Sequence, residues 1–426
     1  MVRTIQRVMG ALSEHVAPSL LAATVGMACG ATRAQDGVYI WEYIDIANPE
    51  LGKRESTVLA PDGAGKFPGH GVNWQSADLT MAWLSGVDLR SSNLRYVILT
   101  NAFMPGSNLS NTDLWSSELV GADLRRVNFS NALVNNATIA GADLSQSSLY
   151  RVNMSNSDLS SSSLANASMY LANFNSSTLD HADLSGASLA RASLTRADLT
   201  GANLNGASID RANLGSVVGF TSSQLYSTST YQSGDLQGVT LSNIDMSGWD
   251  FEGMNLGQIV LWESTLTGSN FRESVLDSAS FSQARLSGAD LTGASISGCD
   301  FSNSTGTGLT FAQLASTANY QAGDLAGIKF VRNDLSGWNL SNQNLSGADI
   351  RYASLAGADL NGANLTGADF QITDFTDATL SSALLVDANL SSANLSNADM
   401  TGADLTGAVL LVAGLTNTDM SGAHIA

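Results

Sequence analysis

The chain places an apolar residue at every fifth position over long stretches. The first uninterrupted run extends from Leu79 to Leu214 and contains 28 such positions, of which 20 are Leu. The residue two positions before each of them is Ala, Ser, Val or Thr in all 28 cases, and the residue in between is Asp or Asn in 15. The segments GADLT, GANLN and NADMT show the pattern in its simplest form.

A period of five fits neither a regular helix nor a plain strand. Five residues advance an α-helix by about 500°, so successive apolar residues would spread around its axis, and strands alternate every two residues. Three extended residues followed by a two-residue corner do fit, because the apolar and small side chains then point inward and the residue between them outward. We therefore expect a Leu/Ala core that includes Leu144, with Phe129 and Phe174 at inward positions.

Four such corners would close a coil of about 20 residues, the distance at which residues of neighbouring coils stack. With its A(D/N)LXX quintets, the sequence resembles the pentapeptide repeat family. The resemblance implies an all-β fold, a right-handed quadrilateral (pentapeptide-repeat) β-helix solenoid, whose coils would rise by the inter-strand spacing of about 4.8 Å. The predicted columns of stacked residues include Leu79, Leu99, Leu119, Ile139, Leu159, Leu179 and Leu199.

The five-residue register breaks twice, and both breaks contain nearly the same sequence. SQLYSTSTYQSGDLQG (223–238) matches AQLASTANYQAGDLAG (312–327), and SGW follows each of them. Thr221 with Gln224, and Thr310 with Gln313, have the spacing of a helix capping box, so we expect one short helix at each break. Trp249 and Trp338 fall at inward positions that are normally small, so we expect each to pack against its helix.

These breaks predict three phased blocks of one solenoid. The expected segments are a signal peptide (1–34), an N-terminal cap (35–73), block 1 (74–218), a helical insert (219–235), block 2 (236–303), a helical insert (304–324) and block 3 (325–426). The QLxSTxxYQxGDL inserts are similar to those of secreted pentapeptide repeat proteins, which implies no particular activity. An alternative interpretation is a duplicated binding pocket at the two breaks, with Tyr231/Asp235 and Tyr320/Asp324 at the rims.

The two ends of the repeat differ. Residues 35–73 lack it, and because exposed ladder edges invite aggregation, we expect VYIWEYIDI to form a covering strand and Trp74 to seal the first coil. The final quintets are regular and place Leu410, Leu415, Met420 and Ile425 in the last coil with no covering segment. Exposed apolar ends usually find a partner, so we expect an end-to-end homodimer through the C-terminal coil.

The N-terminal segment has the order of a secretory signal. Arg3 and Arg7 precede an apolar run, and small residues follow it up to Ala34. We therefore expect an extracytoplasmic protein, secreted or periplasmic, and a cytoplasmic one if this segment is not a signal. No other segment offers the roughly 20 apolar residues that span a bilayer, so no transmembrane anchor is expected.

The net charge of −19 excludes a protein that binds a phosphate backbone through bulk positive charge, and no nucleic-acid partner is expected. The resemblance also includes acidic pentapeptide repeat proteins that resemble DNA and act on DNA gyrase. From Tyr352 onward there are eight Asp and no Lys or Arg. The repeat distributes them around all faces of the coil, so they form no single phosphate-like strand.

The sequence offers little catalytic or metal-binding chemistry. It contains no P-loop, no HExxH, no CxxC and no EF-hand loop. His70 is expected at a turn, the pair Asp180–His181 at an exposed corner, and Cys299 in the core as an unreactive thiol. We therefore predict no catalytic, cofactor-binding or metal residues, and no cofactor.

The leading interpretation is a non-enzymatic secreted rod that acts as a structural or interaction scaffold for an unidentified protein or glycan. The alternative is an acidic DNA-mimic regulator of DNA gyrase or another topoisomerase in the cytoplasm. An enzyme with a site at the two breaks ranks third.

Overall fold

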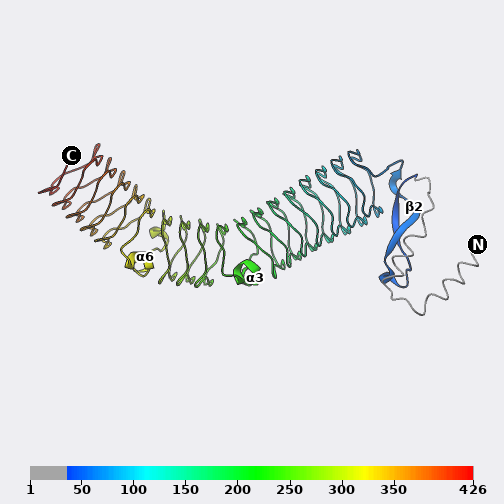
Figure 1. The fold of residues 1–426 in the computed structure, drawn as a ribbon, viewed down its shortest axis with the longest axis horizontal. Coiled ribbons are helices and arrows are strands. Elements are labelled where there is room, and N and C mark those ends of the chain that lie inside the picture. Colours follow the sequence, from blue (N-terminus) through cyan, green and yellow to red (C-terminus); the bar gives the residue numbers. More distant parts are fainter. Residues whose placement is uncertain (1–35, 426) are drawn as a thin grey trace, which may run out of the picture.

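The protein forms a long, bent rod built from many similar coils (Figure 1). The structure is a computed structural model and describes residues 36–425. The predicted signal peptide (1–34) and Cys29 lie outside these residues. No helix among residues 36–425 is both long enough and apolar enough to cross a membrane.

The coils repeat every 20 residues. Parallel bridges join positions 20 apart, as in Asp143↔Ser163, and each coil contributes four bridged positions, one on each side. The amide of Leu144 donates to the carbonyl of Ser163 at 2.7 Å, while the Leu144 side chain is fully buried. Phe129 and Phe174 are fully buried as well. The inward and outward positions predicted from the five-residue period are therefore confirmed.

Each corner turns through a residue with a left-handed backbone. Gly121 and Gly141 have φ of 63° and 65°, and Asn101 has φ of 56° at the equivalent position. Asn tolerates this region better than most residues because its short side chain bonds locally. Gly at a corner therefore avoids the steric cost that a side chain has in this left-handed conformation.

Two inserts interrupt the coils and leave three runs of bridges, 73–218, 235–300 and 324–424. Each insert contains two short helices, whereas one had been predicted, because Thr228 and Thr317 cap a second helix directly after the first. A 3-10 turn (η2) also precedes the second pair. The elements are α3 (Ser222–Ser227), α4 (Ser229–Gln232), η2 (Thr305–Thr307), α5 (Phe311–Ala315) and α6 (Ala318–Gln321).

The predicted capping boxes are present at both inserts. The Thr221 side chain accepts from the amide of Gln224, whose side chain accepts from the amide of Thr221, and Thr310 with Gln313 repeats this arrangement. The side-chain amide nitrogen of Gln224 also donates to the carbonyls of Leu199 and Ala202, at 2.8 and 2.9 Å. Gln224 therefore both completes the capping box and holds the helix against the preceding coil through two hydrogen bonds.

One side of the rod runs without interruption through both inserts. Within residues 36–425, the bridges that span the inserts are Asn213↔Thr240 and Asp300↔Lys329, both on the same side. We call this the continuous side; its bridged positions run from Asn73 to Val409. The ladders of the other three sides stop at each insert and start again after it.

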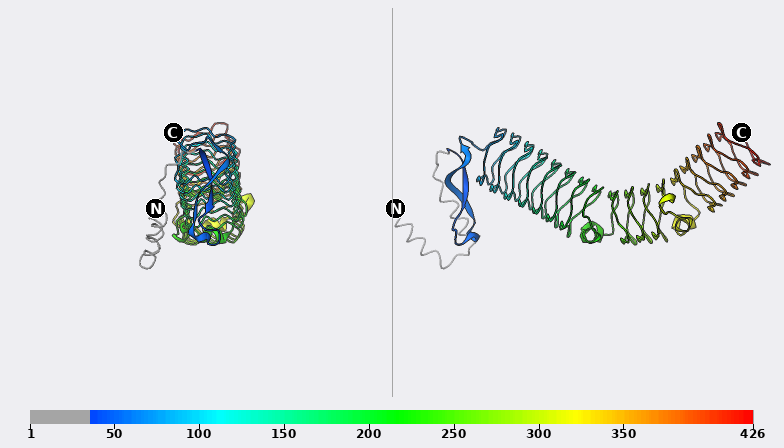
Figure 2. Two further views of the ribbon diagram at one scale, coloured as in Figure 1. Left: turned by 90° about the vertical axis from the view of Figure 1, so that its right-hand side faces the viewer. Right: turned by 180° about the vertical axis from the view of Figure 1, so that it is seen from behind.

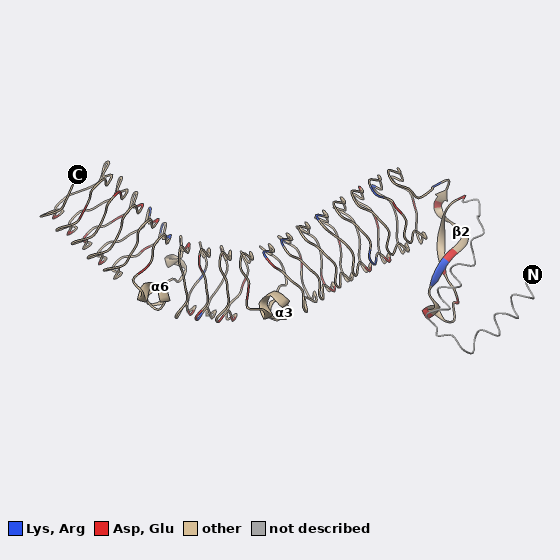
Figure 3. Ribbon diagram, in the orientation of Figure 1, with Lys and Arg blue, Asp and Glu red and all other residues tan. Residues whose placement is uncertain are grey.

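The inserts explain the bends. The inserted residues occupy the three interrupted sides, so they add bulk there and none on the continuous side. The helices α3 and α6 lie on the convex edge of the bent rod in Figure 1 and in the rear view of Figure 2. The continuous side is therefore the concave one. Charged residues are sparse along the described part of the rod (Figure 3).

The N-terminal residues form an antiparallel pair, β1 (Gly37–Tyr43) and β2 (Lys53–Ala64), joined through the 3-10 turn η1 (Pro49–Leu51). The covering strand was predicted at this place. β1 bonds to the first coil, where Trp83 donates its amide to the carbonyl of Tyr39 at 2.7 Å. The end-on view in Figure 2 shows both strands lying across the end of the rod.

We expect Leu144→Asp to destabilise the rod by about 4 kcal/mol, because it places an unpaired carboxylate in the dry core. The free energy of unfolding in urea measures this effect. The matched control is Gln146→Asp at an exposed corner, since Asp377 and Asp387 occupy the same corner position with positive φ. The control should change the free energy of unfolding by less than about 0.5 kcal/mol. Equal losses would contradict the assigned core.

Gly219→Ala and Gly141→Ala should separate backbone preference from steric conflict. Both residues have left-handed φ, 68° and 65°. A Cβ on Gly141 meets nothing within 4 Å, whereas one on Gly219 falls 2.6 Å from the Cα of Thr200. Gly141→Ala should therefore cost about 1 kcal/mol in unfolding free energy, and Gly219→Ala about 2 kcal/mol more. Similar losses for both variants would show that the first insert does not hold the two segments this close.

Candidate functional site

The first insert packs its aromatic rings against the coil that follows. The Tyr226 and Tyr231 ring centroids are 4.5 Å apart, and Trp249 lies 6.4 Å from Tyr226 and 5.9 Å from Phe220. Trp249 is buried. The prediction that this Trp packs against its helix is confirmed, and the rings occupy the place where the alternative interpretation put a pocket.

The two Tyr hydroxyls and the Asp235 carboxylate of this insert form hydrogen bonds within the protein. The Tyr231 hydroxyl donates to the carbonyl of Asp250 at 2.8 Å, and the Asp250 amide donates to the Tyr226 hydroxyl at 2.8 Å. Burial, with smaller contributions from Tyr226 and Asp250, raises the pKa of Tyr231 to about 12. The Asp235 carboxylate accepts from the Asn255 amide group at 3.0 Å. Tyr231 therefore stays neutral, and these groups form no acid–base pair.

The second insert has a similar aromatic cluster, although Ala315 stands at the position of Tyr226 and the additional ring comes from Phe311. The Phe311 ring lies 5.6 Å from Tyr320 and 5.8 Å from Trp338. The Tyr320 hydroxyl donates to the carbonyl of Asn339 at 2.8 Å, and burial raises the pKa of Tyr320. The Asp324 carboxylate accepts from Asn344 at 2.9 Å. Both inserts are thus packed joints between runs of coils.

The remaining candidate residues lie far apart and serve local structure. His181 Nδ1 lies 3.1 Å from Asp180 Oδ2, and both belong to an outer corner, where the His side chain is 67% exposed. Cys299 is buried, its thiol donates to the carbonyl of Leu276 at 3.0 Å, and burial raises the pKa of this thiol. His70 is exposed. Residues 36–425 contain no group of three or more side chains placed to hold a metal ion.

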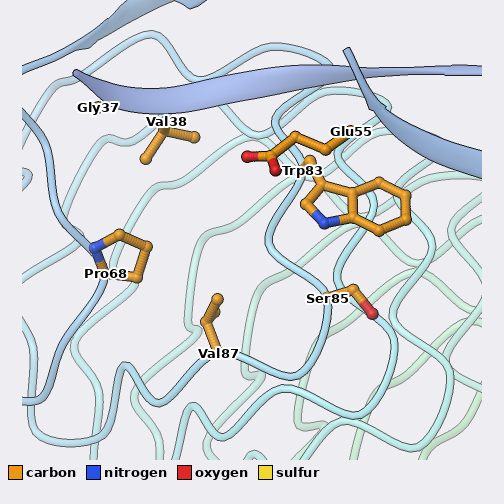
Figure 4. Close-up of a pocket in the computed structure, with 7 residues that line it drawn as sticks. All are labelled: Gly37, Val38, Glu55, Pro68, Trp83, Ser85 and Val87. Atoms are coloured by element: carbon orange, nitrogen blue, oxygen red, sulfur yellow. The ribbon is translucent and has the colours of Figure 1, made fainter. Parts of the chain in front are cut away.

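A small hollow of about 180 Å³ lies between the N-terminal strands and the first coils (Figure 4). It is lined by Gly37, Val38, Glu55, Pro68, Trp83, Ser85 and Val87. Glu55 is the one ionisable side chain in this lining, and the Ser85 hydroxyl faces the carbonyl of Pro105 at 3.4 Å. Within the described residues, no hydrogen bond joins the Glu55 carboxylate to the Ser85 hydroxyl, so the two form no acid–base pair here.

The structure also groups residues that the sequence analysis did not connect. Arg151, Arg191 and Arg211 occupy the same corner beside the continuous side, and Arg196 lies on the other corner of that side. The sequence does contain an indication of this grouping, because positions 151, 191 and 211 differ by multiples of the 20-residue coil. The grouping was not predicted, because these Arg are far apart along the chain and meet only on one side of the coil.

Comparison with known proteins supports the repeat assignment. The family model described as pentapeptide repeats matches in eight copies, which together span more than half of the chain. The matched residues are 75–111, 107–146, 139–175, 177–215, 255–293, 284–314, 344–381 and 373–410. No curated protein matches the chain.

Three solved structures illustrate the similarity. HetL, a pentapeptide repeat protein involved in heterocyst differentiation regulation in the cyanobacterium Nostoc sp. strain PCC 7120, is 22% identical, with 84% of this chain and 91% of HetL covered and a TM-score of 0.18. A pentapeptide repeat protein of the Arabidopsis thaliana thylakoid lumen is 38% identical over 22% of this chain and 61% of its own, with a TM-score of 0.19. QnrB1, a plasmid-mediated fluoroquinolone resistance protein, is 17% identical over 62% and 91%, with a TM-score of 0.21.

The family match includes residues from each of the three runs of bridges. Proteins with these repeats adopt a right-handed quadrilateral β-helix. The chain belongs to the pentapeptide repeat family.

Proposed function

We propose that the protein is a non-enzymatic scaffold that binds a protein or glycan partner along its rod. The observation that supports this proposal is the continuous side, which presents outward side chains at one position per coil from Asn73 to Val409. Extended, regular surfaces of this kind are what repeat proteins use for binding. The histidine, thiol and tyrosine groups described above, by contrast, form local hydrogen bonds or stand alone on the surface.

We also propose that β1 and β2 cap the rod. Ile40 forms an antiparallel bridge with Ala82, and the Trp41 amide donates to the carbonyl of Met81 at 2.9 Å. The Trp41 indole donates to the carbonyl of Asn101 at 2.7 Å. The bond to Met81 satisfies a backbone group of the first coil that would otherwise offer an edge for aggregation, and the bond to Asn101 ties Trp41 to the second coil.

Export is part of the proposal, and the signal pattern of residues 1–34 supports it. The alternative is an acidic cytoplasmic regulator of a topoisomerase, and the net charge of −19 favours it. The same charge follows from the Asp that the repeat places at outward positions, as in GADLT. The charge therefore distinguishes the two functions poorly.

The location of the mature protein separates these functions. We expect N-terminal sequencing of the exported protein to begin at Thr32 or Gln35, just after the apolar run. An excess of the purified rod should leave DNA supercoiling by gyrase unchanged. Retention of the first 34 residues in a cytoplasmic protein, or inhibition of supercoiling, would contradict the scaffold proposal and support the alternative.

We further propose that the C-terminal coil forms an end-to-end homodimer. The inward residues Leu415 and Ile425 expose 43% and 62% of their surface, whereas Leu395 and Leu405, at the same positions one coil earlier, are buried. A second copy would cover these apolar side chains, and hydrophobic burial would drive the association.

Light scattering should detect the dimer at tens of micromolar protein, roughly the range that a modest apolar interface supports. Leu415→Asp should shift the protein to monomer, because it places a carboxylate on the apolar end of the last coil. The matched control, Leu384→Asp, changes a side chain that is 45% exposed on the side of the rod and should leave the dimer intact. A monomeric wild-type protein would rule out this association.

A further inference from the structure

The concave surface of the first run, 73–218, differs in charge from the rest of that run. We define the concave face as the continuous side of this run together with the two corners that flank it. It contains six Arg and two Asp, a net charge of +4: Arg90, Arg95, Arg151, Arg191, Arg196, Arg211, Asp113 and Asp210. The other sides and corners of the run contain two Arg and nine acidic residues, a net charge of −7. In Figure 3, several blue segments lie along the concave edge of this arm.

Four of the six Arg lack an acidic partner. Arg90 pairs with Asp88 at 3.0 Å and Arg95 with Asp113 at 3.8 Å. Among residues 36–425, no carboxylate oxygen lies within 4.0 Å of the other four guanidinium groups, which belong to exposed side chains: Arg151, Arg191, Arg196 and Arg211. These four Arg are therefore available to an external anion.

Arg191 and Arg211 lie in successive coils at the same corner. The Arg191 amide donates to the carbonyl of Asp210 at 2.8 Å, so the two backbones are one coil step of about 4.8 Å apart. The Asp210 carboxylate accepts from Ser208 and Thr230 at 3.0 and 3.1 Å and pairs with neither Arg. Positive side chains on neighbouring coils of one corner repel each other, and a bound anion would relieve that repulsion.

Aromatic side chains border the same face on both corners. The Tyr150 and Tyr170 rings are stacked, with centroids 6.0 Å apart and planes 5° apart, and the Arg151 guanidinium lies 5.6 Å from the Tyr150 centroid. On the other corner, the rings of Tyr96 and Trp115 pack edge to face at 4.9 Å. Flat rings with a polar tip offer apolar contact area together with a hydrogen-bonding group.

The middle of the face combines apolar and amide groups. Leu133 stands at an outward position that usually holds Asp or Asn, and it is 47% exposed. The Asn173 side-chain amide group donates to the Asn153 side-chain oxygen at 3.1 Å, and within residues 36–425 the Asn153 amide nitrogen donates no hydrogen bond. The face therefore presents an apolar patch, amide donors and unpaired Arg side by side.

We propose that this concave face binds an extended acidic polysaccharide. Arg side chains pair with carboxylate or sulfate groups, the rings and Leu133 contact the C–H faces of the sugars, and the amides donate to hydroxyls. From the coil of Tyr96 to that of Arg211 there are six steps of about 4.8 Å, so the face accommodates an extended chain about 29 Å long. This inference rests on the proposed scaffold function and identifies the chemistry of one partner.

The charge distribution favours a thin chain over duplex DNA. A duplex lying on the face would bring its phosphates close to the adjoining sides, whose net charge is −7, and would meet repulsion there. An extended polysaccharide fits within the concave face and avoids those sides. Single-stranded nucleic acid remains an outcome that the experiment distinguishes.

The test measures binding of the full-length protein to polygalacturonate, to neutral dextran and to single-stranded oligothymidylate, at low and physiological salt. We expect binding to polygalacturonate that weakens as salt rises, and no binding to dextran. The double variant Arg191→Gln/Arg211→Gln should weaken the affinity at least about tenfold, because it removes two charge-assisted contacts. Gln already occupies the same corner position with positive φ at 146, 258 and 283, so the variant should fold.

The matched control is Arg126→Gln/Arg285→Gln, which removes the same charge from exposed positions on other parts of the rod. It should retain wild-type affinity within about twofold. No binding to polygalacturonate, equal losses in both double variants, or tighter binding to oligothymidylate would each overturn the inference. If the exported rod instead captures its partner through another side, the scaffold function stands and this inference fails.

Discussion

The hydrogen-bonded ladder between coils is the constraint on which the rest of the structure depends. A residue must meet its counterpart 20 positions later, and each coil therefore needs four equal sides of five residues. Two positions of every five face inward, so the core accepts Leu, Phe and Ala and excludes charge. The outward positions can vary, and the corners favour Gly or Asn because their backbone is left-handed. Low charge and abundant Gly are consequences of this ladder.

The period of five made much of the fold predictable from the sequence, because every inward position is set by the same local rule. The capping boxes at Thr221 and Thr310 likewise indicated helices, since their hydrogen bonds are local. The second helix of each insert was not predicted, because its Thr cap has no Gln or Glu three residues later. The concave face was also missed: Arg151, Arg191 and Arg211 are distant in sequence and meet only when residues are sorted by side of the coil.

The inserts have a structural role that follows from their position. Each adds residues to three sides of the coil and leaves the fourth untouched, so it bends the rod toward the continuous side (Figure 1). Trp249 and Trp338 fill the space where the coil restarts, and this explains why a large ring occupies a position that is small elsewhere. The duplicated sequence thus produces two similar bends in one rod.

The uninterrupted side also determines how the rod behaves as a mechanical object. Its ladder of hydrogen bonds crosses both inserts, so the length of this side is set by the number of coil steps and does not change when the rod bends at an insert. Flexing at a joint would open or close the opposite side, where the ladders are broken, and would leave the continuous side at nearly constant length. This side is thus close to the neutral axis of a bent beam, the line whose length does not change on bending. A chain bound along it would keep its register while the rod bends.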